Sequence, residues 1–303
     1  MKKIAVVGSI NLDYMLTVPH MPQTEETLLA QNFETLPGGK GANQAYAAGK
    51  LLGNVTRLGA VGDDSAGEVV CESLRSAGVD ISRIRRVQGE ATGSAFICVD
   101  PRGNNHIVVA QGANRAVDIA YLKENDDVLA GCDILVLQLE IPLETVVYAA
   151  KRAKELGKLT ILDPAPARRD IPHELYPCID FLKPNEGEAA LLAGLPAGDP
   201  MAAAKGLREM GVKNVLVTLG ADGALLLDEA GEIKKFPALT GLSVVDTTAA
   251  GDCFTAAFAC RLAAGDSSEQ AIRFAVKASG LSVMRPGAQP SLPTLKEVED
   301  WQG

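Results

Sequence analysis

A run of small residues that ends in a carboxylate is the strongest candidate for chemistry in this sequence. It extends from Asp246 to Asp252 and leads directly into a helical pattern. The first N–H groups of a helix lack partners within the helix, so they attract anions, and small residues allow a phosphate group to approach closely. Asp252, at the edge of such a site, could accept a proton from an incoming hydroxyl group. Taken alone, Asp252 is equally typical of a helix cap.

A glycine-rich turn, Pro37 to Asn43, also precedes a helical pattern. Paired glycines permit positive φ angles or close approach of a ligand to the backbone. The turn is not a Walker A loop, because no Ser or Thr follows Lys40 at the required spacing. On the local pattern, a tight turn that binds nothing is an open alternative.

A third polar segment, Gly8 to Asp13, follows the first apolar run of the chain. In an α/β protein, ligands lie at the carboxyl edge of the sheet, where such a segment is placed. The spacing lacks the G-x-G-x-x-G fingerprint, which disfavours a dinucleotide site and an oxidoreductase. Asn11 and Asp13 alternate on an extended segment and could both face a polyhydroxylated ligand, or they could form an Asx-type turn.

Short strands and helices alternate along the chain and must position these residues. Strands are expected at Ile4 to Gly8, Val55 to Val61, Ile134 to Leu139, Leu159 to Leu162 and Val215 to Leu219. Helices are expected at Ala42 to Leu52, Ala66 to Ala77, Leu143 to Leu156, Gly251 to Ala264, Ser268 to Val283 and Thr294 to Trp301. This rhythm predicts an α/β fold, a three-layer sandwich in which helices cover both faces of a central, mostly parallel sheet.

Two regions, 13–36 and 93–110, break this alternation and look like strand pairs without an intervening helix. Their strands are expected at Asp13 to Val18, Leu28 to Leu36, Gly93 to Val99 and His106 to Ala110. Segments that cannot join the parallel sheet in sequence can form a separate small sheet, so we assign both regions to a discontinuous β lid; ordinary surface hairpins are the alternative. No repeat or linker is evident, so residues 1–303 are expected to form one domain.

The composition and charge of the chain disfavour several classes of function. The 303 residues carry a formal net charge of -9, which argues against a nucleic-acid surface. The six widely spaced cysteines contain no C-x-x-C pair and are expected to be reduced thiols, and the three histidines lack metal-ligand spacing, which disfavours zinc. No apolar run is long enough to predict a membrane span or a secretory signal, which favours a cytoplasmic protein.

The segments Gly38 to Asn43 and Asp246 to Asp252 resemble the two signature patterns of the PfkB carbohydrate kinases. Further matches, in chain order, are Gly8 to Asp13, Gln138 to Glu140, Pro164 to Ala167, Lys183 to Glu186 with Glu188, Thr218 to Gly220, and Gly287 to Ser291. The resemblance covers nearly the whole chain. It implies transfer of the terminal phosphoryl group of ATP to a sugar hydroxyl, with the primary 5-hydroxyl of ribose as the expected acceptor.

The resemblance also implies roles for individual residues. Asp252 matches the family's catalytic base, and its anion hole is matched by Ala249, Ala250 and Gly251. The sugar-contacting positions are matched by Asn11, Asp13, Gly39, Lys40, Gly41, Asn43, Glu140 and Asp252. The nucleotide-contacting positions are matched by Asn185, Thr218, Leu219, Gly220, Ala221, Asp222, Gly223 and Gly251.

Two metal sites are implied in the same way. Glu188 lies, with Asn185, in the segment that the family associates with Mg2+ and phosphate. A monovalent-cation site, expected to favour K+ and built mostly from backbone carbonyls, is matched by Asp246, Thr248, Ser282, Arg285, Gly287 and Ser291.

The chain departs from the family pattern at three places. Ala249 and Ala250 lie in a run where the signature commonly has Gly. Val276 stands where some members carry a His near the adenine, which leaves the base contacts open. Asp163 occupies a place that is often held by Asn.

The sequence leaves the identity of the acceptor and the oligomeric state open. Deoxyribose, a keto-deoxy sugar acid or a nucleoside are alternative acceptors, although Asp13 should repel a carboxylate and so favours a vicinal diol. A non-catalytic sugar or nucleotide sensor is a further alternative, which the intact Asp252 disfavours. Exposed edges of the lid strands could pair between two subunits, which predicts a homodimer.

Overall fold

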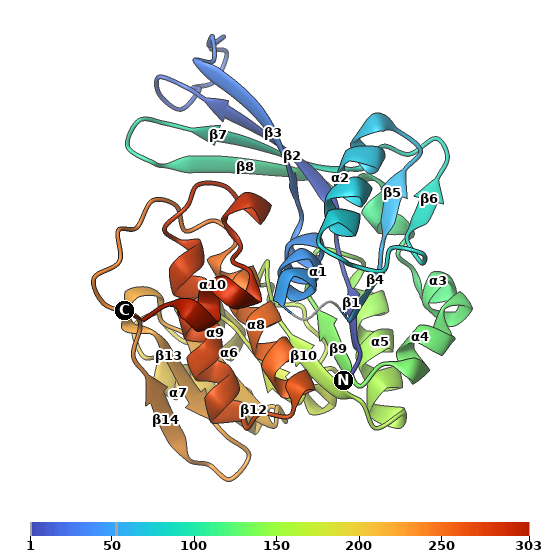
Figure 1. Cartoon of the computed structure of the whole chain (residues 1–303), viewed down its shortest axis with the longest axis vertical. Helices are drawn as coiled ribbons and strands as arrows, with labels where there is room; N and C mark the ends of the chain where they lie inside the picture. The colour runs from blue at the N-terminus through green and yellow to red at the C-terminus, as the bar shows by residue number, and fades with distance from the viewer. Residues whose placement is uncertain (1, 52–53, 303) are drawn as a thin grey trace.

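An eight-stranded sheet runs through the centre of the molecule (Figure 1). The computed structural model describes residues 2–51 and 54–302. The strands lie in the order β14 (Ile233–Phe236), β13 (Ala224–Leu227), β12 (Asn214–Thr218), β11 (Phe181–Leu182), β10 (Leu159–Leu162), β9 (Ile134–Leu137), β1 (Ile4–Val7) and β4 (Val55–Leu58). Neighbours are parallel except β12 with β13 and β13 with β14. The predicted mostly parallel sheet is therefore confirmed.

Helices cover both faces of this sheet, because its strands bury both sets of alternating side chains. Ile4 and Val6 join one core, whereas Ala5 and Val7 join the other. The helices in the first core are α1 (Lys40–Leu51), α2 (Ser65–Ser76), α8 (Ala250–Ala264), α9 (Ser268–Ser282) and α10 (Leu295–Asp300). The helices in the second are α3 (Ile119–Glu124), α4 (Asp126–Gly131), α5 (Leu143–Glu155), α6 (Glu186–Ala193) and α7 (Pro200–Glu209). The three-layer fold predicted from the sequence is confirmed.

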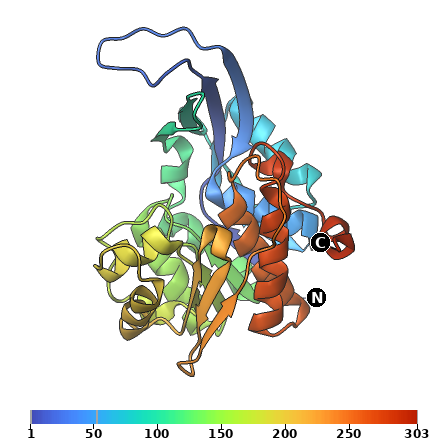
Figure 2. The same ribbon diagram turned by 90° about the vertical axis from the view of Figure 1, so that its left-hand side faces the viewer.

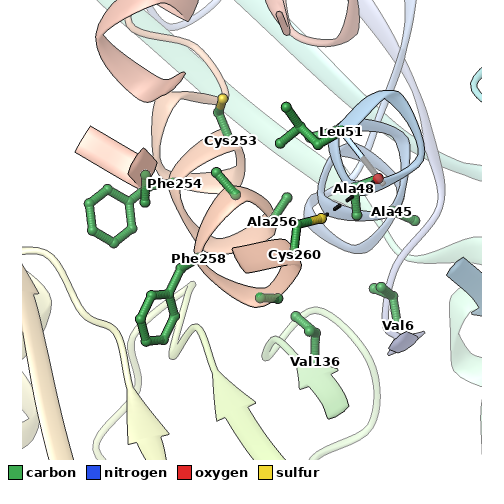
Figure 3. Close-up of a cluster of buried hydrophobic side chains, with 14 of the residues drawn as sticks. Val6, Ala45, Ala48, Leu51, Val136, Cys253, Phe254, Ala256, Phe258 and Cys260 are labelled. Carbon is green, nitrogen blue, oxygen red and sulfur yellow. Dashed lines mark hydrogen bonds between the residues drawn. The ribbon is translucent and has the colours of Figure 1, made fainter. Parts of the chain in front are cut away.

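Helix α8 carries the candidate base and is buried on almost every side. Its small residues allow close packing against α1, where Ala45 and Ala48 lie near it (Figure 3). The Cys260 thiol donates to the carbonyl oxygen of Ala48 at 3.7 Å, and Phe258 packs edge-to-face on Phe181 with ring centroids 4.9 Å apart. Helix α8 is therefore fixed against both the sheet and the helix that follows the glycine-rich turn.

A second, four-stranded sheet, here called the outer sheet, stands away from the main body (Figures 1 and 2). Its strands lie in the order β3 (Asn32–Gly38), β2 (Asn11–Thr17), β7 (Gly93–Val99) and β8 (Asn105–Ala110). Strands β2 and β7 pair in parallel, with Asn11 opposite Gly93, so the two regions that break the βα rhythm form one sheet and not separate hairpins. That this sheet acts as a lid stays a prediction.

One predicted strand is two strands in different sheets. The segment Val55 to Val61 forms β4 and β5 (Ala60–Gly62), and β5 pairs with β6 (Arg85–Val87). Gly59 separates them, because its N–H donates to the Tyr121 hydroxyl at 2.8 Å and not to a sheet neighbour. A run of apolar residues cannot reveal such a change of partner.

Other boundaries shift by a few residues. β3 begins at Asn32 and not at Leu28, since Asn32 pairs with Thr17, the last residue of β2. The predicted strand Ile134 to Leu139 ends at Leu137. Leu52, the predicted end of the first helix, lies outside the described residues. Short 3-10 helices occur at Gly112–Ala116, Tyr176–Cys178, Gly220–Asp222 and Gln289–Ser291.

The six cysteines are free thiols, as predicted; they are Cys71, Cys98, Cys132, Cys178, Cys253 and Cys260. Across residues 2–51 and 54–302, no helix has the length and apolar character needed to cross a bilayer.

Candidate active site

The carboxylate of Asp252 lies buried in the first turn of α8. Its Oδ2 accepts a hydrogen bond from Asn43 Nδ2 at 3.0 Å, and its Oδ1 accepts one from Gln44 Nε2 at 2.9 Å. Burial raises the pKa of Asp252; the charge of Lys40 opposes this shift, and the charge of Asp163 adds to it. Asp252 therefore does not cap its helix. It is a buried, oriented carboxylate at the point where the small-residue run meets the glycine-rich turn.

The start of α8 offers free N–H groups. Ala249 precedes the helix with a φ of 59°, in the left-handed region that residues other than glycine rarely adopt. Within the part of the chain that the structure describes, the N–H groups of Gly251 and Asp252 have no hydrogen-bond acceptor, whereas that of Ala250 donates to the carbonyl of Thr247 at 3.2 Å. Two free amides beside a carboxylate can hold an anion next to a group that takes a proton.

Two glycines allow the start of α1 to pack against the segment Gly8 to Asp13. Gly39 has a φ of 85°, and a Cβ there would lie 2.8 Å from the backbone nitrogen of Asn11. A Cβ at Gly41 would lie 2.8 Å from the backbone nitrogen of Ser9. Because any side chain at these positions would collide with backbone, the two motifs can meet only through glycine.

Lys40, between these two glycines, is surrounded by carboxylates. Burial alone would lower the pKa of its ammonium group, but the neighbouring negative charges prevail and raise it. The carboxylates are those of Asp252, Asp163, Glu140 and Glu188. Lys40 is therefore a permanent cation at the centre of the site.

Asn11 and Asp13 lie on β2 and not in an Asx-type turn. Asn11 is buried, and its Oδ1 accepts a hydrogen bond from Asn114 Nδ2 at 2.8 Å. Asp13 Oδ1 has no hydrogen-bond donor among the described residues. Burial, and then the charges of Glu140 and Asp252, raise the pKa of Asp13 to about 7. A shielded acceptor without a donor is unfavourable unless a ligand supplies one.

Glu140 joins two of the predicted motifs. Its Oε2 accepts hydrogen bonds from the Ser9 hydroxyl and, at 3.0 Å, from the backbone N–H of Lys40. Burial raises the pKa of Glu140, while the charge of Lys40 and these two bonds lower it. The carboxylate thus ties the start of α1 to the segment that leads into β2.

Gln44, Asp163 and Lys183 contribute to the site although the sequence patterns gave them no role. Gln44 Nε2 also donates to Asp163 Oδ2 at 2.8 Å. Lys183 Nζ lies 3.2 Å from Asp163 Oδ1 and donates to the carbonyl of Gly251 at 3.3 Å. The sequence features that could have indicated these roles are a Gln within the Ala-rich start of a helix and a Lys between an apolar strand and Pro184.

The predicted Mg2+ and phosphate segment begins at the end of β11. Asn185 caps α6 by accepting a hydrogen bond from the N–H of Glu188 at 2.8 Å, and Glu188 Oε2 accepts one from the N–H of Asn185 at 2.8 Å. Asn185 also forms an isolated β-bridge with Thr218 at the end of β12. Burial raises the pKa of Glu188, which interacts with the charges of Asp163 and Lys183. The second carboxylate oxygen of Glu188 is available for a hydrated cation.

The predicted nucleotide turn follows β12 and includes the 3-10 helix of Gly220, Ala221 and Asp222. The N–H of Leu219 donates to the carbonyl of Gly223 at 2.8 Å, which closes the turn. Gly223 has a φ of 92°, and a Cβ there would lie 2.0 Å from the carbonyl oxygen of Phe236. The glycine is therefore needed for the turn itself, and nucleotide contact stays a prediction.

Two of the residues predicted to bind K+, Thr248 and Gly287, donate hydrogen bonds to a third, Asp246. Asp246 Oδ1 accepts hydrogen bonds from the backbone and hydroxyl of Thr248 at 2.8 and 2.6 Å, and Oδ2 accepts one from the N–H of Gly287 at 2.8 Å. These bonds lower the pKa of Asp246 although burial opposes them. The Arg285 guanidinium donates to Glu297 at 2.6 Å, so only the backbone carbonyl of Arg285 could serve a cation.

Two more of these predicted ligands, Ser282 and Ser291, are buried. Their hydroxyl groups donate to the carbonyls of Ser279 and Ala288, at 2.8 and 2.7 Å. No group of three or more His, Cys, Asp or Glu side chains among the residues described is arranged to hold a metal ion. A carbonyl-lined monovalent site needs no such group, and it stays a prediction.

Known proteins match the chain along nearly its whole length. The model of the family described as pfkB family carbohydrate kinase matches residues 1–295. A ribokinase from Haemophilus influenzae is 38% identical over 302 residues, covering 98% of this chain and 97% of the relative. A deoxyribokinase from Salmonella typhi is 36% identical over 302 residues, covering 98% of each. The solved structure of Arabidopsis thaliana ribokinase complexed with ribose and ATP has a TM-score of 0.92 and 36% identity, covering 98% of this chain and 97% of that one.

Proposed function

The chain belongs to the pfkB family of carbohydrate kinases, and we propose that it transfers the γ-phosphoryl group of ATP to the primary 5-hydroxyl of D-ribose with Asp252 as the general base. It is a ribokinase-type sugar kinase, a phosphotransferase with an alcohol acceptor. The observation that carries the proposal is a buried carboxylate beside two free N–H groups at a helix start. Phosphoryl transfer needs these two devices, one to accept a proton and one to stabilise charge.

In the proposed reaction, the carboxylate of Asp252 takes the proton of the 5-hydroxyl as that oxygen bonds to the γ-phosphorus. The bond between the γ-phosphorus and the bridging oxygen breaks, ADP leaves with the electron pair, and Asp252 returns the proton to solvent. The N–H groups of Ala249 to Asp252 form the anion hole, with those of Gly251 and Asp252 free for the phosphoryl oxygens. Asn43 and Gln44 hold the carboxylate in one orientation, which favours attack from one direction.

We assign sugar recognition to the polar groups around the first residues of β2. Asn11, Asp13 and Glu140 supply acceptors, and Asp13 has an oxygen without a donor that a sugar hydroxyl would satisfy. Lys40 supplies a cation close to both the sugar and the transferred group. The Arabidopsis relative of known structure was solved with ribose and ATP, which supports this choice of acceptor.

ATP is assigned to the segment from Asn185 to Gly223, next to the start of α8. When bound there, Mg2+ would neutralise phosphate charge, with Glu188 and Asn185 holding it through water. K+ would bind among the carbonyls near Asp246 and order the run that leads to Asp252. The β-bridge between Asn185 and Thr218 supports the first assignment, and the hydrogen bond from the N–H of Gly287 to Asp246 supports the second.

The outer sheet supports two further proposals. Closure over the sugar would exclude water from the site and limit hydrolysis of ATP. Its apolar side chains are exposed, which suits pairing with the same sheet of a second copy as a homodimer. They are Phe33, Phe96, Ile107, Val108 and Val109. Because the reaction consumes ATP and the six thiols are free, we also place the protein in the cytoplasm.

A panel of acceptors with ATP and Mg2+ tests the proposal. ADP release is measured with ribose, deoxyribose, a keto-deoxy sugar acid and nucleosides, each with K+ and with Na+ in its place, and phosphorus NMR identifies the product. We expect ribose 5-phosphate and the highest kcat/KM with ribose. Higher kcat/KM with deoxyribose would establish the second candidate, which the Salmonella deoxyribokinase favours. If no acceptor led to ADP release, the result would favour the alternative that the protein is a non-catalytic sensor.

A further inference from the structure

A buried ion pair lies beside Asp252 and has no part in the chemistry proposed above. Lys183 Nζ lies 3.2 Å from Asp163 Oδ1, and the two side chains are only 4% and 2% exposed. Asp163 follows β10 and Lys183 follows β11, so the pair spans the carboxyl ends of neighbouring parallel strands. Because removing two charges from water is unfavourable, a pair in this position calls for a role other than stability.

The side chain of each member of the pair also makes a hydrogen bond that leads to Asp252. Lys183 Nζ donates to the carbonyl oxygen of Gly251 at 3.3 Å, and the same oxygen accepts the Thr255 hydroxyl at 3.0 Å. Gly251 directly precedes Asp252 and supplies one of the two free N–H groups. The ammonium therefore fixes the backbone that presents both the base and the anion site.

On the other side, Gln44 connects Asp163 to Asp252. Gln44 Nε2 donates to Asp163 Oδ2 at 2.8 Å and to Asp252 Oδ1 at 2.9 Å, which uses both of its hydrogens. The amide nitrogen must face both carboxylates, because the amide oxygen cannot donate, so the side chain has one allowed orientation. Gln138 Nε2 donates to Gln44 Oε1 at 2.5 Å and reinforces it.

Building on the role of Asp252 proposed above, we propose that Lys183 and Asp163 are positioning residues for phosphoryl transfer. Lys183 holds the first turn of α8 through the Gly251 carbonyl, and Asp163 holds the Asp252 carboxylate through Gln44. The charge of Asp163 also raises the pKa of Asp252, and the ammonium of Lys183 offsets that charge. Without the ammonium, two carboxylates bridged by one amide would repel each other.

The pair predicts pH effects of opposite sign. The charge of Asp163 raises the pKa of Asp252, so removing it should lower that pKa. Lys183 neutralises Asp163 at 3.2 Å, so removing the ammonium should leave the Asp163 charge uncompensated and raise the pKa of Asp252. The other charged groups that face this cluster are Asp13 on β2, Lys40 on α1, Glu140 after β9 and Glu188 on α6. These remain in place in each variant, so they contribute equally to all profiles.

The test is the pH dependence of kcat at saturating sugar and ATP, for Asp163→Asn, Lys183→Met and the double variant. We expect the acid limb to move down by about one pH unit in Asp163→Asn and up by about one unit in Lys183→Met. In the double variant the limb should return towards its original pH. Each variant should lose about 10- to 100-fold in kcat, with KM for both substrates nearly unchanged.

Asp126→Asn is the matched control, since it breaks a 2.7 Å ion pair with Arg152 on the opposite face of the sheet. It should leave the profile unchanged. Acid limbs that stay in place, or that move in the same direction in both single variants, would overturn the proposal and leave a merely structural pair. If a single variant fails to fold, the neutral double variant decides, because wild-type kcat there contradicts the positioning role. Asp252→Asn is measured alongside, since retained turnover there would instead overturn the assignment of the base.

Discussion

The carboxylate of Asp252 accepts a hydrogen bond from the side chain of Asn43 at 3.0 Å, although 209 positions separate the two residues. Asn43 follows a turn that only glycine can form, and Asp252 follows a residue in the left-handed region. Two unusual backbone segments are thus built to bring one amide to one carboxylate. The orientation of this carboxylate, the proposed base, therefore depends on both α1 and α8.

Asp252→Asn should lower kcat about 100- to 10,000-fold and leave nucleotide affinity nearly unchanged, because an amide cannot accept the hydroxyl proton. Steady-state kinetics and calorimetric titration of ATP measure the two quantities. Asp266→Asn is the control, since Asp266 pairs with Arg261 near the far end of the same helix and should be close to wild type. Near-normal turnover in Asp252→Asn would show that another group removes the proton.

Asp13→Asn should stabilise the free protein at pH 8 by a few degrees in Tm. The folded pKa of Asp13 is about 7 against an ordinary value of 3.8, so the folded state binds more protons between these values and loses stability as pH rises. The gain of the variant should therefore shrink from pH 7 towards pH 4. The same change should raise KM for ribose about 10- to 100-fold, because a charged acceptor is lost.

Thermal unfolding from pH 4 to 8 and kinetics at pH 8 check this prediction. Glu34→Gln, an exposed carboxylate on β3, serves as the control. A Tm gain that grew at lower pH would contradict the assigned shift. An unchanged KM would remove Asp13 from the sugar site.

Gly39→Ala should raise KM for the sugar as well as destabilise the fold, since its Cβ would lie 2.8 Å from the backbone nitrogen of Asn11. Gly89→Ala separates the two effects. Gly89 also has a positive φ, 76° against 85°, but a Cβ there would meet nothing within 4 Å. We expect Gly89→Ala to lose about 1 to 2 kcal/mol of stability from its positive φ alone. Gly39→Ala should lose more, because the collision adds to the same backbone cost, and only Gly39→Ala should alter KM. Equal KM values in the two variants would contradict this account.

Asp246→Ala should abolish stimulation by K+, because it releases both Thr248 and Gly287 from one carboxylate. Turnover is measured against K+ concentration at constant ionic strength, with Na+ as replacement. Asp228→Ala is the control: Asp228 likewise accepts a backbone N–H, that of Glu232, but in the turn between β13 and β14. Wild-type stimulation in Asp246→Ala would place the cation elsewhere.

The sequence predicted the layers of the fold because strand and helix periodicity depend on local residue types. Ile4 to Val7 and the helix from Ser268 to Ser282 appear close to where they were expected. The strand at Val55 was extended too far, because only the tertiary contact of Gly59 with Tyr121 ends it. Long-range partners of this kind leave no periodic signal.

Some residues of the candidate site could likewise be predicted from the sequence, and others could not. Asp252 and Gly39 belong to local motifs, so their positions could be predicted from the chain alone. Gln44 has no such motif, since a Gln on a helix is ordinarily exposed, and only the approach of Asp163 and Asp252 from distant strands and helices makes it a bridge. Lys183 likewise gains its role from burial next to Gly251.

Strand β2 runs without interruption through the outer sheet, from Asn11 beside Gly39 to Thr17 at its other end. It is paired on both sides along its length, which makes it stiff. Strand β2 is therefore a rigid element that carries Asn11 and Asp13 near one end. A tilt of the outer sheet near Thr17 must therefore also turn Asn11 and Asp13, which couples movement of this sheet mechanically to the proposed contact with the sugar.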